Sequence, residues 1–218
     1  MSNEIVKKIK KAAVIPVIEI DSVEDAIPLA NALLEGGINI VEITLRSSKA
    51  IKCAEEIIKN VKSISVGVGT LISADQVTSA IDIGVDFAFS PGCNPKIINL
   101  SIKENLLFIP GISTPTEIEI AYDNGCNILK YFHSESNGGL TYLKNIYKPY
   151  NHLNLKFIPT GGVNLSNCLN YINNDFVLAI GSGWIAPKEL IRSKNWNLIT
   201  SNARNFLNKI KKIKNQFH

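Results

Sequence analysis

The stretch Ile128-Leu129-Lys130-Tyr131-Phe132 is one of eight short β-type runs that recur along this 218-residue chain. The runs begin near residues 13, 39, 64, 86, 106, 128, 156 and 177. Continuous apolar runs of this length are typical of strands that are covered on both faces. Helical patterns fill the intervals, and several of them end at a glycine that can cap a helix. Eight alternations of strand and helix predict an α/β fold, a (β/α)₈ TIM barrel.

The main competitor is an open doubly wound sheet. Against it, no Gly-x-Gly-x-x-Gly follows the first run, and the unusual residues are spread over many strand ends instead of one crevice. No linker or break in composition divides the chain. We therefore expect one domain over residues 1–218, with an N-terminal helix at 1–11 and a C-terminal helix at 196–217.

Composition sets further bounds. A hydrophobic content of 45% is enough for one well-filled core without disulfides or metal. No apolar segment approaches the roughly 20 residues of a membrane span, and the start of the chain lacks a signal-peptide pattern, so we expect a cytoplasmic protein. The cysteines, Cys53, Cys93, Cys126 and Cys168, form no Cys-x-x-Cys pair. They predict four reduced thiols and no zinc site.

The net charge of +4 comes from the two ends of the chain. Four lysines and one glutamate lie in residues 1–11, and five basic residues with no acidic one lie in 203–218, so the body between is net acidic. The terminal lysines alternate with isoleucines and leucines at helical spacing, which is typical of amphipathic helices with a solvated face. A nucleic-acid partner is not expected, because no basic and aromatic surface marks the body.

Two ionisable residues interrupt the buried runs. Lys130 lies in the middle of the sixth run, and Glu42 interrupts residues 40–45 in the same way. Burying an ammonium is costly unless it is paired or gives up its proton. A neutral lysine is a nucleophile that attacks carbonyls to form Schiff bases. The alternative is a lysine whose ammonium reaches solvent past Phe132, but we favour a catalytic Lys130–Glu42 pair.

Polar residues stand at the carboxyl ends of the predicted strands, where barrels of this kind carry their chemistry. Glu42, Thr44 and Arg46 share one face of the second strand, because residues two apart point the same way. The structural alternative is a Glu42–Arg46 ion pair on the rim. Glu19, near the end of the first strand, is either a rim residue or a second lumenal carboxylate, and it ranks below Glu42 as a base.

Glycines mark other strand ends. Gly67 and Gly69 in the third strand indicate close approach of backbone or ligand, or relief of crowding in a tight barrel. Glycine-rich turns at 159–163 and 181–183 follow the seventh and eighth strands. Backbone N–H groups in those two turns often cradle a phosphate in such barrels.

Other chemistries find little support. The histidines His133, His152 and His218 lack a ligand-like spacing. No Gly-x-Ser-x-Gly elbow presents a serine nucleophile. We therefore expect no metal and no cofactor.

Six ordered motifs resemble those of the 2-keto-3-deoxy-6-phosphogluconate (KDPG) and 4-hydroxy-2-oxoglutarate (KHG) aldolases, from about Val14 to Trp184. They are Val41-Glu42-Ile43-Thr44-Leu45-Arg46, Gly67-Val68-Gly69-Thr70, Ser90-Pro91-Gly92, Ile109-Pro110-Gly111-Ile112-Ser113-Thr114, Lys130-Tyr131-Phe132 and Pro159-Thr160-Gly161-Gly162-Val163. The resemblance implies a trimeric, metal-independent class I aldolase that cleaves a phosphorylated keto acid to pyruvate and glyceraldehyde 3-phosphate, with 4-hydroxy-2-oxoglutarate as a second substrate.

By the same resemblance, Lys130 is the Schiff-base lysine and Glu42 the general acid/base. Arg46 and Thr70 resemble residues that bind the pyruvate side of the substrate. Two further positions resemble pocket walls, Pro91 and Phe132.

The phosphate side of the resemblance includes two departures. Gly161 and Gly162 match the phosphate-holding glycines, and Thr160 matches the threonine of the gluconate-type enzyme. The family's Gly-Gly-Ser-Trp after the last strand reads Gly181-Ser182-Gly183-Trp184 here, so we expect contacts from the backbone of Gly181 and Ser182 more than from a hydroxyl. His133 stands in place of the usual proline after Phe132, where it can alter the loop over the site or its pH response.

Two other functions remain open from the residues. One is a phosphosugar isomerase on the same barrel with Glu42 as base. The other is a barrel that binds a phosphosugar without catalysis.

Overall fold

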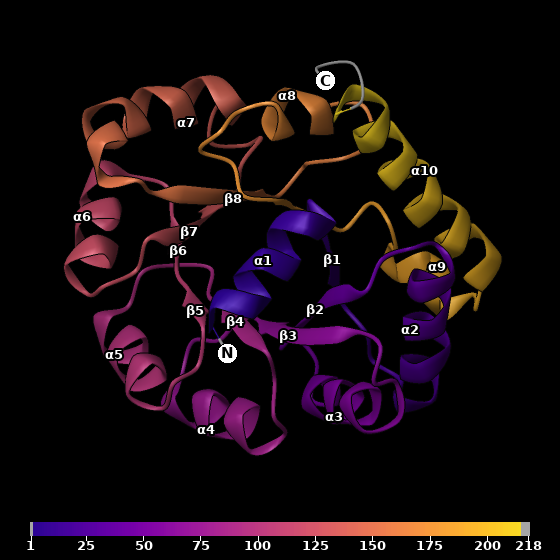
Figure 1. The fold of residues 1–218 in the computed structure, drawn as a ribbon. Coiled ribbons are helices and arrows are strands. Elements are labelled where there is room, and N and C mark those ends of the chain that lie inside the picture. The colour runs from indigo at the N-terminus through magenta and orange to yellow at the C-terminus, as the bar shows by residue number, and fades with distance from the viewer. Residues whose placement is uncertain (1, 215–218) are drawn as a thin grey trace.

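The computed structural model describes residues 2–214, and Figure 1 shows them as a ring of strands surrounded by helices. The sheet runs in the order β5-β4-β3-β2-β1-β9-β8-β7-β6, and the strands of each neighbouring pair are parallel. The strands are β1 (Val14–Ile18), β2 (Ile40–Thr44), β3 (Ser65–Gly69), β4 (Phe87–Phe89), β5 (Phe108–Ile109), β6 (Gly111–Ile112), β7 (Ile128–Phe132), β8 (Lys156–Thr160) and β9 (Ile180–Ser182). The predicted barrel is confirmed.

The fifth predicted strand, over residues 106–109, is followed after Pro110 by a second short strand, β6, which makes nine strands where the sequence predicted eight. Pro110 lies at the break. Proline has no N–H to donate to the ladder, although its carbonyl still accepts from the Lys130 N–H at 2.8 Å. Because β5 pairs with β4 and β6 pairs with β7, this one stretch of chain supplies both ends of the strand order and nearly closes the barrel.

The last predicted strand begins later than expected. Val177 forms only an isolated bridge to Phe157 of β8, and the strand proper is Ile180–Ser182. From Ile180 onward the chain pairs with β1, and at Gly181 it also pairs with β8.

Helices follow most of the strands, as expected for a (β/α) alternation. They are α1 (Ser2–Ala12), η1 (Val23–Asp25), α2 (Ala26–Glu35), α3 (Ala50–Asn60), α4 (Ala74–Asp82), α5 (Pro95–Lys103), α6 (Pro115–Asp123), α7 (Gly139–Tyr147), η2 (Lys148–Leu153), α8 (Cys168–Ile172), α9 (Lys188–Arg192) and α10 (Trp196–Lys214). Ser73 with Gln76, and Thr114 with Glu117, form capping boxes that start α4 and α6. Glycines at positive φ, such as Gly84 (77°), follow the helix ends, as predicted.

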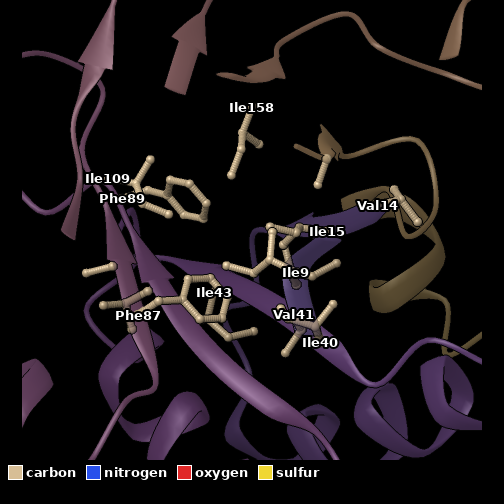
Figure 2. Packing of buried hydrophobic residues seen from close by; sticks show 14 of the residues in the cluster. Ile9, Val14, Ile15, Ile40, Val41, Ile43, Phe87, Phe89, Ile109 and Ile158 are labelled. Atoms are coloured by element: carbon tan, nitrogen blue, oxygen red, sulfur yellow. The ribbon is translucent and has the colours of Figure 1, made fainter. Parts of the chain in front are cut away.

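Helix α1 crosses the amino-terminal end of the barrel, at the centre of Figure 1. Its Ile9 is fully buried and belongs to the cluster of buried apolar side chains that Figure 2 shows. Lys8 Nζ donates to Oγ of Ser65, the first residue of β3, at 2.7 Å. Because α1 covers this end, the chemistry is directed to the opposite end, where the strands finish.

The two terminal helices were expected at 1–11 and 196–217. The structure has them at Ser2–Ala12 and Trp196–Lys214, and residues 1 and 215–217 of these predictions lie outside the described residues. One cluster of buried apolar residues extends from Ile5 to Ile210. A single domain over residues 1–218 stays a prediction. Within residues 2–214, no helix has the length and hydropathy needed to cross a membrane.

Candidate active site

The two charged residues that interrupt the buried strands lie in direct contact. Lys130 Nζ of β7 donates to Glu42 Oε1 of β2 at 3.0 Å, although the residues are 88 positions apart in sequence. Their side chains are 5% and 1% exposed. Lys130 therefore does not reach bulk solvent, and the snorkelling alternative is wrong. Glu42 is paired with Lys130 and not with Arg46, so the rim-pair alternative is also wrong.

Aromatic rings surround the lysine nitrogen. Lys130 Nζ lies 4.9 Å from the ring centroid of Phe89 and 5.1 Å from that of Phe132. Rings at this distance attract a cation and also exclude water from the amine. Sequence reasoning named Phe132 but missed Phe89. The signal was present, because Phe87 and Phe89 are two apart in β4 and so share a face of the strand.

Glycines in β3 make room for this pair and its surroundings. A Cβ at Gly69 would lie 1.8 Å from Glu42 Oε1, and a Cβ at Gly67 would lie 2.1 Å from the ring of Phe87. Of the two interpretations drawn from the sequence, relief of crowding inside the barrel describes both positions. The Glu42 carboxylate can thus occupy its position only because residue 69 has no side chain.

We expect Gly69→Ala to lower kcat for any reaction that uses Glu42 by about 10²-fold, because displacing a reacting group by an ångström costs that much. The new Cβ would occupy the position of the carboxylate oxygen. Gly92→Ala is the matched control, since a Cβ there meets nothing within 4 Å. Steady-state kinetics and thermal unfolding of both variants check this. A Gly69→Ala enzyme with normal kcat would contradict it.

Charged residues form a network on the rim around Arg46. Arg46 Nη1 lies 3.9 Å from Glu19 Oε2, with side chains 47% and 34% exposed. Lys188 forms an ion pair with Glu19 and lies 3.3 Å from Asp21, which also binds Arg192 at 2.8 Å. Hydrogen bonds from Arg192 and then Lys188 hold the pKa of Asp21 below its usual value. Glu19 is therefore a rim residue held by cations, in agreement with the first of its two interpretations.

Thr70 follows β3 directly, and Pro91 lies two residues after the end of β4. Thr70 has a φ of 63°, in the left-handed region that β-branched residues avoid, and such a conformation costs of order 1–3 kcal/mol. Pro91 is exposed, and its carbonyl oxygen lies where a Cβ at Gly111 would be, at 2.2 Å. Strained backbone of the kind found at Thr70 is common at functional sites.

The glycine turns after β8 and β9 are neighbours. Thr160 pairs with Gly181 across the two strands, and a Cβ at Gly181 would lie 2.3 Å from Thr160 Oγ1. Gly161 and Gly162 have φ values of 102° and 78°, which favour glycine. Ser182 Oγ donates to the Val163 carbonyl at 2.8 Å and is buried. Its hydroxyl therefore ties the two turns together, which leaves their backbone N–H groups as the donors suited to a phosphate.

Metal ligands and thiol nucleophiles are the other groups to consider. Among the residues that the structure describes, no three His, Cys, Asp or Glu side chains gather to hold a metal ion. All four cysteines are free. Burial raises the pKa of Cys53, Cys93 and Cys126 to about 11, which makes these thiols poor nucleophiles.

Comparison with known proteins identifies the family. The family model described as KDPG and KHG aldolase matches residues 5–202. The 2-dehydro-3-deoxy-phosphogluconate aldolase of Haemophilus influenzae is 35% identical over 210 residues, which cover 96% of this chain and 98% of that protein. The KHG/KDPG aldolase of Escherichia coli K12 is 35% identical over 191 residues, 88% of this chain and 89% of that protein.

Solved structures agree. KDPG aldolase from Legionella pneumophila, with pyruvate captured at low pH as a covalent carbinolamine intermediate, has a TM-score of 0.87 at 36% identity and covers 91% of this chain and 96% of its own. The 2-keto-3-deoxy-6-phosphogluconate aldolase of Zymomonas mobilis with 3-phosphoglycerate also has a TM-score of 0.87, at 29% identity. The match covers 94% of this chain and 96% of that one. The resemblance found in the sequence motifs is thereby confirmed, and the chain belongs to the KDPG and KHG aldolase family.

Proposed function

We propose that this protein is a class I aldolase that cleaves KDPG to pyruvate and glyceraldehyde 3-phosphate, and 4-hydroxy-2-oxoglutarate to pyruvate and glyoxylate. The observation that carries the proposal is the buried contact of 3.0 Å between Lys130 and Glu42. A buried amine beside a carboxylate and two aromatic rings suits carbonyl attack by lysine, because burial favours the neutral amine and the carboxylate can take up its proton. The covalent pyruvate adduct of the Legionella relative supports the same chemistry.

The reaction begins when the Lys130 amine adds to the C2 ketone of the keto acid. The carbinolamine that forms loses water to give a protonated imine, which acts as an electron sink. Glu42, 3.0 Å from the nitrogen, takes a proton from Lys130 and gives it to the carbinolamine hydroxyl, which leaves as water. The carboxylate restored in this way then accepts the proton of the C4 hydroxyl. The C3–C4 bond breaks, its electrons enter the imine to form an enamine, and the aldehyde departs. Protonation of the enamine at C3 and hydrolysis then release pyruvate and restore the amine.

The remaining site residues bind the two ends of the substrate. Arg46 binds the pyruvate carboxylate, since its planar guanidinium suits two oxygens, and Thr70 assists from the next strand end. Pro91 and Phe132 form walls of the pocket. A further set binds the phosphate, mainly through the backbone: Thr160, Gly161, Gly162, Gly181 and Ser182.

The mechanism assigns the electron sink to the imine and requires neither metal nor cofactor. We expect full activity after dialysis against excess chelator, measured as pyruvate release. Loss of activity that Zn²⁺ or Mg²⁺ restores would instead indicate a metal-dependent aldolase.

Exchange of the pyruvate methyl protons in D₂O tests the proposal directly, because it needs the enamine but no aldehyde. We expect the methyl signal to decay by NMR, and borohydride with pyruvate to add a covalent adduct at Lys130 by peptide mass. Absence of both would reject the aldolase. An isomerase would interconvert sugar phosphates without pyruvate release, and a binding barrel would bind by calorimetry without turnover.

The assembly and location follow the family resemblance. We propose a homotrimer, which analytical ultracentrifugation tests, and a cytoplasmic protein whose partner is its small-molecule substrate, with no nucleic acid or membrane.

A further inference from the structure

The imidazole of His133 is exposed at the mouth of the site, beside the turn after β8. His133 follows β7 directly, and its ring lies 3.5 Å from that of Phe132, centroid to centroid. A Cβ at Gly161 would lie 3.0 Å from His133 Nδ1 and 3.2 Å from His133 Cβ. The imidazole therefore lies between a wall of the pocket and the first glycine of the turn after β8.

The backbone around His133 is bound to that same turn. The Ser134 N–H donates to the Thr160 carbonyl at 2.8 Å, and the Glu135 N–H donates to the Gly161 carbonyl at 3.1 Å. Two backbone hydrogen bonds thus join the segment that carries the imidazole to the glycine turn. The position of the ring is set by this backbone contact as well as by its own rotamer.

The charges that face His133 are mostly positive. Burial, then Arg46 from the loop after β2, then Lys130 from β7 lower the pKa of His133. Three carboxylates lie near these groups: Glu42 accepts from Lys130, Glu19 lies 3.9 Å from Arg46, and Glu135 accepts from the Tyr171 hydroxyl. The charged groups that act on His133 itself, Arg46 and Lys130, are both cations, which suits a position beside a bound dianion.

We propose that His133 donates a hydrogen bond to the phosphate of the substrate and so selects phosphorylated keto acids. This rests on the proposed function. A phosphate held by the N–H groups of Gly161 and Gly162 would lie within reach of the imidazole, whose Nδ1 lies 3.0 Å from the position of a Cβ at Gly161. A phosphate monoester carries a charge of about −1.5 to −2 at neutral pH and accepts strongly. Binding it favours the imidazolium, whose bond to the phosphate is charge-assisted.

His133→Gln tests the role by comparing two reactions of one enzyme. We expect the ratio of kcat/KM for KDPG cleavage to kcat/KM for pyruvate methyl exchange to fall about 10-fold, mostly through KM for KDPG, as for loss of a charge-assisted hydrogen bond. Pyruvate has no phosphate, so exchange reports the imine chemistry alone. His152→Gln is the matched control, because His152 is exposed in η2, which precedes the amino end of β8. Its ratio is expected to equal that of the wild type.

Equal losses in both reactions of His133→Gln would mean that the residue only supports the fold of the loop, and would overturn the proposal. A His133→Gln variant that loses neither activity would overturn it as well. If the wild-type enzyme neither exchanges pyruvate nor cleaves KDPG, it is the aldolase assignment that fails.

A histidine titration by NMR gives a readout that does not depend on activity. Sulfate is the probe, because it stays a dianion between about pH 5 and 8 while phosphate itself titrates near pH 6. We expect excess sulfate, against chloride at equal ionic strength, to raise the pKa of His133 and leave that of His152 unmoved, since a bound dianion favours the imidazolium. A His133 titration that does not respond to sulfate would overturn the proposal even if the enzyme is an active aldolase.

Discussion

Lys130→Arg is expected to lower kcat for KDPG cleavage by about 10⁴- to 10⁶-fold, the scale seen when a covalent nucleophile is removed. Arginine keeps a positive charge beside Glu42, but its guanidinium does not lose a proton in proteins and forms no imine. Lys130 is buried against Glu42, Phe89 and Phe132, so no other amine takes its place. The measurements are pyruvate release and borohydride trapping with pyruvate.

Lys156→Arg is the control for this experiment. Lys156 begins β8, and its ammonium donates to the Asp175 carbonyl at 2.9 Å, away from the pair. We expect this variant to keep wild-type kcat and to be trapped by borohydride at Lys130. Substantial cleavage by Lys130→Arg would reject Lys130 as the nucleophile and favour the isomerase or another lysine.

The barrel could be predicted because its determinants are local. Each strand is a short apolar run and each helix carries its own caps, such as Ser73 with Gln76, so pattern and turn chemistry agree along the chain. The sequence also contains the signal that separates β5 from β6, because Pro110 has no N–H to donate to the ladder. The hydrophobic periodicity did not predict that the chain contacts β8 at Val177 and pairs with β1 from Ile180 onward. That pairing depends on how β1 and β8 are placed in the barrel.

The buried contact between Lys130 and Glu42 could be predicted for a different reason. A charge inside a buried strand is costly, so Lys130 and Glu42 each required an explanation that the other supplied. Contacts between loops carry no such signal. That Arg46 lies near Glu19, or that the Ser182 hydroxyl turns to the Val163 carbonyl, follows from the tertiary position of groups that are remote in sequence. The left-handed backbone of Thr70 is likewise invisible to propensity, which disfavours it.

Glu42→Gln is expected to lower kcat by about 10²- to 10⁴-fold, the usual contribution of a positioned general acid/base. Glutamine has nearly the same shape, and it fits the space that Gly69 leaves beside Glu42. Its amide cannot accept the C4 hydroxyl proton or return a proton to the enamine. The variant should also lose stability, because the ammonium of Lys130 would be left buried without its counter-ion, and breaking such a pair costs about 3–5 kcal/mol.

Two measurements separate the lost base from a damaged site. Borohydride trapping with pyruvate, carried to its end point, should still modify Lys130 in Glu42→Gln, while methyl exchange in D₂O and KDPG cleavage both slow. Glu19→Gln is the control, since its rim pair with Arg46 is partly exposed and worth at most about 1 kcal/mol, so its kcat should change by less than about fivefold. If Glu19→Gln loses activity and Glu42→Gln keeps it, the rim carboxylate is the base, and the contact between Lys130 and Glu42 has only a structural role.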